Sequence, residues 1–241
     1  MGSAAPPGPK ERLACGLARV IELRRALHAD PAVNARWLAV KQWQASRLAR
    51  TYPDLLASAR YRPASEFFLE ELYGAKDFEA RDNEALRVVP KLARMLPERA
   101  VETMALAVEL DETSESLDAR LAEAIRLPVD AAGYARAYRE TGTLAERQLQ
   151  IDTVDRIGRT LEKLARIPLL SGMLHMMRAP AEAAGFGHLH HFLQSGFDAF
   201  RAMGSAGEFL ATIRRRETVL MQALFDGRTA ELERPELLIR G

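Results

Sequence analysis

The sequence has little that would support several common classes of protein. Cysteine occurs once, at Cys15, so no disulfide can form within the chain, and a reducing compartment suits it. The longest apolar run, IPLLSGMLHMM at 167–177, is too short to span a bilayer. The N-terminal MGSAAPPGPKER contains no apolar segment of the kind found in secretory signals. These absences predict a cytoplasmic protein with no membrane span.

No sign of charge dominates, and no familiar catalytic motif is present. Lysine and arginine number 34 against 33 acids, so no global field would attract nucleic acid, and no nucleic-acid partner is expected. The chain contains no HExxH, no CxxC and no phosphate-binding glycine loop. Alternating Val, Ile and Thr runs and Asn-Gly turns, which mark strands and hairpins, are also missing.

Helical spacing of apolar residues is the pattern that remains. At 241 residues and 48% hydrophobic, the chain can bury one sizeable core. The clearest helix start is Thr143 followed by Glu146, a capping box. We predict an all-α, single-domain, orthogonal or bundle-like array of about eight to ten helices over residues 10–227. Residues 1–9 are small, Pro- and Gly-rich and expected to be disordered, and 228–241 form a polar C-terminal tail.

The densest run of aromatic, carboxylate and arginine residues is 61–90. Pro63 suits the first turn of a short helix, and its aromatic residues cover more than one face, so burial is expected. The acids of this stretch either form a solvated face that pairs with its arginines, or line a cleft beside an aromatic wall.

The same stretch carries a family resemblance. FFLEELYG at 67–74, followed by KDFEARD at 76–82, resembles a motif of a bacterial family of uncharacterised, all-helical proteins. The likeness covers 63–97, with a weaker echo in HHFLQSGFDAFRAMG at 190–204. The resemblance implies a bacterial helical protein, and it assigns no activity and no site residue.

A second group of candidates lies on the long helix predicted after Pro97. One apolar stripe turns acidic at Asp111, Glu115 and Asp118, and Glu112 lies beside it. Neighbouring carboxylates repel, so a buried cluster would need arginines, protons or a metal. Three interpretations stay open: the helix leaves the core and its acids face water, the acids bind a hard metal, or they pair with arginines at a subunit interface.

The segment PLLSGMLHMMRA at 168–179 is apolar nearly all round. We expect it in the centre of the core, with a ligand pocket as the alternative, because methionines adapt to irregular shapes. His175 within it is either a hydrogen-bonded core histidine or a ligand. His188 and His191 stand one helical turn apart, so they either chelate a metal or lie at the surface of a helix start.

Three functions are compatible with these patterns. The first is a non-enzymatic interaction or dimerisation module, favoured by the missing catalytic motif and by a surplus of apolar helix faces. It predicts a homodimer that buries one of those faces.

The second function is binding of an apolar or planar small molecule, such as haem or an acyl chain. Its candidate lining residues are Phe67, Phe68, Tyr73, Arg81, Met173, His175, Met176, Met177 and His191. The third is a metal-dependent hydrolase or oxygenase that uses helix carboxylates. Its candidate ligands are Glu112, Glu115, Asp118, His188 and His191.

Overall fold

The computed structural model describes residues 7–72 and 79–239, which form α-helices and one π-helix and contain no strand, confirming the all-α prediction. The longer helices are α1 (Pro9–Ala29), α2 (Pro31–Thr51), α5 (Glu79–Met95), α6 (Glu98–Ala124), α7 (Ala131–Thr141), α8 (Leu144–Ala165), α9 (Pro168–Met176), α11 (Gly187–Met203) and α12 (Gly207–Phe225). The shorter ones are α3 (Pro53–Ala57), α4 (Arg62–Phe67), the π-helix η1 (Phe68–Leu72), α10 (Arg178–Ala183), α13 (Ala230–Glu233) and α14 (Glu236–Ile239). None of the described helices is long and apolar enough to cross a bilayer.

Local capping signals start two of the long helices where the sequence predicts them. The side chain of Thr143 accepts a hydrogen bond from the backbone N–H of Glu146 at 3.2 Å, and the Glu146 carboxylate accepts one from the N–H of Thr143 at 2.8 Å. This hydrogen bond from the Thr143 backbone lowers the pKa of Glu146 to about 2. Asp30 caps α2 by accepting from the N–H of Ala32 at 2.8 Å.

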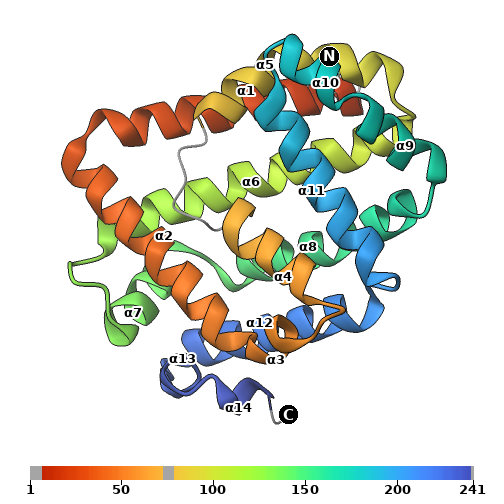
Figure 1. Ribbon diagram of the computed structural model, residues 1–241. Coiled ribbons are helices and arrows are strands. Elements are labelled where there is room, and N and C mark those ends of the chain that lie inside the picture. The colour runs from red at the N-terminus through yellow and green to blue at the C-terminus, as the bar shows by residue number, and fades with distance from the viewer. Residues whose placement is uncertain (1–6, 73–78, 240–241) are drawn as a thin grey trace, which may run out of the picture.

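Helix α6 lies at the centre of the N-terminal half. It packs against α1, α2, α7 and α8, and its Leu117 and Leu121 are fully buried. In Figure 1, α2 and α11 run steeply across the direction of α1 and α6. The helices therefore form an orthogonal array around α6.

Helix α11 organises the other half. It contacts α4, α5, α8, α9 and α10, and Phe200 near its end is fully buried. The Phe68 ring packs 6.3 Å from the Phe200 ring and 5.9 Å from the Phe209 ring, measured between centroids. The FFLEEL part of the family-like motif thus forms the end of α4 and the π-helix η1, and it builds this core.

The structure describes the family-like motif only in part. Tyr73, a predicted ligand residue, and the rest of the motif through residue 78 lie outside the described residues. The segment predicted as a polar tail contains α13 and α14, whose Leu232 and Leu238 are buried in a cluster with Val40 of α2. This end of the chain packs against α12 (Figure 1).

Gly196 gives a test of the α4–α11 crossing. A Cβ at this position would lie 2.7 Å from Cζ of Phe67, closer than side chains tolerate. We expect Gly196→Ala to lower the free energy of unfolding by about 1–2 kcal/mol, since overpacking outweighs the gain in helix propensity. Urea denaturation followed by circular dichroism would measure this.

Gly172→Ala is the matched control, because a Cβ on Gly172 would meet no atom within 4 Å. We expect that variant to be as stable as wild type or up to about 1 kcal/mol more stable. Equal stability of the two variants would contradict the close crossing.

Candidate functional site

The acids of α6 point into the protein. Glu115 is only 1% exposed. Its carboxylate accepts hydrogen bonds from Arg24 of α1 at 3.0 Å, from Lys41 of α2 at 3.1 Å and from the indole N–H of Trp37 at 3.2 Å. The interpretation in which α6 leaves the core and its acids face water is therefore wrong, because α1 and α2 cover this side of the helix.

A buried polar network extends from this carboxylate. Arg24 also donates to Asp82 of α5 at 2.6 Å and to Asp111 at 2.8 Å. On the other side, Lys41 lies 2.8 Å from Asp118. Gln44 continues the chain, because its amide donates to Asp118 at 2.8 Å and to the hydroxyl of Tyr134 on α7 at 3.3 Å. We call these residues, with Glu115 and Trp37, the Glu115 network.

The charges of the Glu115 network stabilise one another. Burial opposes ionisation of Glu115, but the charges of Lys41 and Arg24 outweigh it and lower the pKa of this carboxyl. Burial likewise opposes the charge of Lys41, but Asp118 and Glu115 outweigh it and raise the pKa of the amine. These groups are therefore ionised at neutral pH.

The predicted metal ligands are engaged in other ways. Glu112 pairs with Arg19 at 2.6 Å, and Asp118 pairs with Lys41 in the Glu115 network. His188 and His191 are exposed on α11. Among the residues that the structure describes, no group of three or more His, Cys, Asp or Glu side chains is arranged to hold a metal ion. Each of the three predicted acidic ligands pairs with a cation of the same chain.

The predicted ligand residues do not share one pocket. The Phe67 ring packs against the Phe192 ring, with 5.5 Å between their centroids. The Arg81 guanidinium carbon lies 4.8 Å from the centroid of the same Phe192 ring. Burial lowers the pKa of Arg81. His191 lines a shallow groove of about 400 Å³ between α4 and α11, which Phe67 also borders. The methionines and His175 belong to α9, on another side of α11.

The expectation that the apolar residues of α9 lie in the centre of the core is wrong. Leu169 is 69% exposed, Met173 is 43% exposed and Met176 is 72% exposed. Their spacing of four and three residues places them on one face of the helix, which we call the α9 stripe. The helix contacts α8, α10 and α11, and these neighbours cover its other side, where Ser171 is buried.

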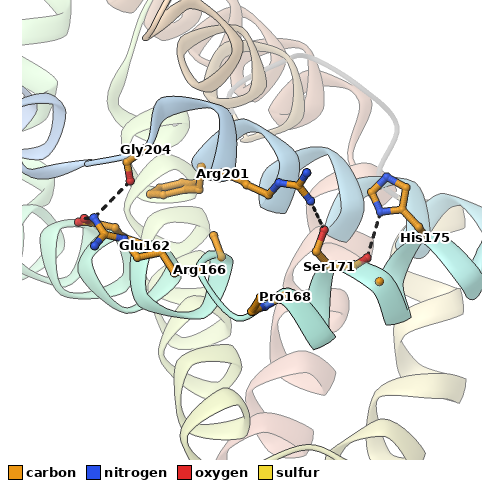
Figure 2. Close-up of a pocket in the computed structure, with 10 residues that line it drawn as sticks. Glu162, Arg166, Pro168, Ser171, His175, Arg201 and Gly204 are labelled. Atoms are coloured by element: carbon orange, nitrogen blue, oxygen red, sulfur yellow. Dashed lines mark hydrogen bonds and ion pairs between the residues drawn. The ribbon is translucent and has the colours of Figure 1, made fainter.

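A groove of about 820 Å³ lies beside this helix, and we call it the α9 groove (Figure 2). It is lined by Glu162, Ala165, Arg166, Pro168, Ser171, Gly172, His175, Phe200, Arg201 and Gly204. Arg201 donates to the Ser171 hydroxyl, and His175 Nδ1 lies 3.0 Å from the Ser171 carbonyl oxygen. Arg166 donates to Glu162 at 2.5 Å. Charged and apolar surfaces therefore meet along α9.

A comparison with family models identifies the chain. The model of a domain of unknown function, DUF8198, matches residues 23–231. The chain belongs to the DUF8198 family. No curated protein and no solved structure matches it. Membership of an uncharacterised family, expected from the motif at 67–82, is confirmed, and the DUF8198 match spans the Glu115 network, the α9 stripe and the α9 groove.

The sequence of this DUF8198 protein does not reveal which cations pair with the candidate acids. Arg24 and Lys41 were not recognised as partners of Glu115, because they are 91 and 74 residues away in sequence. Arg201 and Ser171 of the α9 groove were not selected either. The available signal was Arg201 itself, a cation beside the buried Phe200.

Substitutions at two acids of the same helix, Glu112 and Glu115, test the Glu115 network. Glu115→Gln removes the carboxylate that two buried cations share, although Arg24 keeps Asp82 and Asp111 and Lys41 keeps Asp118. We therefore expect a loss of about 1.5–3 kcal/mol in the free energy of unfolding. Glu112→Gln removes an ion pair with the exposed Arg19, and we expect a loss below about 1 kcal/mol. Chemical denaturation of both variants measures the contrast; similar losses would argue against the network.

The pH dependence of stability tests the ionised state of Glu115. Its folded-state pKa lies below the ordinary value of 4.5, so its stabilising effect is complete above that pH and is lost as pH falls through the folded-state pKa. Protonated Glu115 resembles glutamine. We therefore expect the stability difference between wild type and Glu115→Gln to shrink as pH falls below 4.5. A difference that stays constant from neutral to strongly acidic pH would show that Glu115 is not ionised.

Proposed function

We propose that this DUF8198 protein is a non-enzymatic interaction module that pairs with a second copy of itself through α9. The observation that carries the proposal is the α9 stripe. Three large apolar side chains, Leu169, Met173 and Met176, face solvent from one helix of nine residues. Ile167 and Met177 at its two ends are also exposed.

Exposing such an apolar cluster to water costs free energy, and association that buries the cluster recovers it. Burying a large apolar side chain is worth about 1.5–3 kcal/mol, and contiguous exposed apolar patches mark interaction sites. Methionine suits a contact surface, since its unbranched side chain adapts to the partner. Single exposed leucines elsewhere, such as Leu149 of α8, are ordinary surface residues by comparison.

Charge complementarity favours a second copy as the occupant. The pair Glu162–Arg166 precedes the α9 stripe, and the pair Arg178–Glu182 follows it. A twofold axis perpendicular to α9 would make the two copies of this helix antiparallel, and that arrangement would direct Arg166 of one copy toward Glu182 of the other. The chain has a net charge of +1, so long-range repulsion between copies is small.

The remaining parts of the proposal rest on the sequence. The FFLEELYG motif supports a bacterial origin, and the single Cys15 supports a reducing, cytoplasmic location. The enzymatic alternative has less support, because the α6 acids that would bind a metal have cation partners within the chain.

A matched pair of leucine substitutions tests self-association. We expect wild type to sediment as a dimer at micromolar concentrations and Leu169→Glu to weaken the dimer about tenfold or more, because the charge would be buried in the interface. Sedimentation velocity over a concentration series measures both species.

Leu149→Glu is the control, because Leu149 is 62% exposed on α8 and lies outside the α9 stripe. It should leave the dimer unchanged. A wild-type protein that stays monomeric throughout the series, or equal weakening by the two substitutions, would refute pairing through α9.

A further inference from the structure

We infer that the α9 groove binds a small organic carboxylate with an apolar chain, and that Arg201 holds its carboxylate. The groove lies between the end of α8, the inner side of α9 and the end of α11 (Figure 2). Its volume of about 820 Å³ falls in the range of small-molecule sites. The groove adjoins the α9 stripe, but this inference does not rest on the proposed self-association.

In the described part of the chain, Arg201 is a cation without an ion-pair partner. Its guanidinium donates to the hydroxyl of Ser171, which is itself buried. Within 7–72 and 79–239, no carboxylate makes an ion pair with Arg201, whereas Arg166 across the groove is paired with Glu162. An arginine has five N–H donors, so most donors of Arg201 stay available for a ligand.

The geometry of these groups favours a carboxylate head. A guanidinium can donate two parallel hydrogen bonds to the two oxygens of one carboxylate. A phosphate dianion carries a second negative charge, and the other arginine of the groove, Arg166, is already paired with Glu162. Ser171 fixes the Arg201 side chain by accepting one of its hydrogen bonds, so a ligand meets a positioned guanidinium.

Apolar residues surround this charged group. Phe200 and Ala165 are buried in the core cluster and contribute to the wall of the groove, and Pro168 starts α9 there. At Gly172 the space is open, since a Cβ would meet no atom within 4 Å. An alkyl chain bound at Arg201 can therefore lie along the open space at Gly172.

Isothermal titration calorimetry with decanoate, below its micelle concentration, tests the site. We expect saturable binding at one site per chain, and at least tenfold weaker binding of decanol, which lacks the charge. Decyl phosphate serves as the third probe and should bind no more tightly than decanoate.

Two variants with matched controls locate the site. Arg201→Gln should weaken decanoate binding about tenfold or more, while Arg215→Gln, at an exposed arginine of α12 outside the groove, should leave it unchanged. Gly172→Leu should fill the open space and abolish binding, while Gly172→Ala should reduce it little. Circular dichroism melts confirm that each variant is folded.

Several results would overturn the inference. They are absence of saturable decanoate binding to wild type, wild-type affinity in Arg201→Gln or in folded Gly172→Leu, equal affinity for decanol, and a preference for decyl phosphate. Sedimentation of Arg201→Gln should match wild type, so failure of the ligand site and failure of self-association are told apart.

Discussion

The N-terminal half of this fold depends on one buried carboxylate. Glu115 accepts hydrogen bonds from Arg24 on α1 and from Lys41 and Trp37 on α2. If either helix shifted along α6, a buried charge would lose its partner, which costs several kcal/mol. Apolar contacts tolerate small shifts, but this charged contact does not. Glu115 therefore sets how α1 and α2 lie on α6, while leucines such as Leu117 supply the burial.

The C-terminal half is held differently, and this difference exposes α9. Here aromatic rings carry the packing, with Phe68 from η1 between Phe200 and Phe209. A helix of nine residues on the outside of that core has neighbours on one side. Ser171 is buried on that side, and Leu169, Met173 and Met176 face solvent on the other. The polar groove and the apolar stripe thus lie on one short helix held by a rigid scaffold.

Particular residues show how far prediction from sequence could go. Leu117 and Leu121 of α6 lie in the core, and a neighbouring stripe of the helix turns acidic where α1 and α2 cover it. Its cause was not readable, because the partners of Glu115 are on other helices. The composition of α9 was misread as core, since an all-round apolar helix suits both a protein centre and an exposed contact surface.

The sequence by itself determined the all-α class and the start of helices such as α8, because side-chain spacing and the Thr143 cap act within a few residues. It also determined that the acids of α6 would need partners if buried, since like charges repel wherever they lie. Only the tertiary structure decided that Arg24 and Lys41 supply those partners, and that α9 lies at the surface with Arg201 beside it. These outcomes depend on which helices cross. Crossings are set by the summed packing of many distant residues, which no local pattern contains.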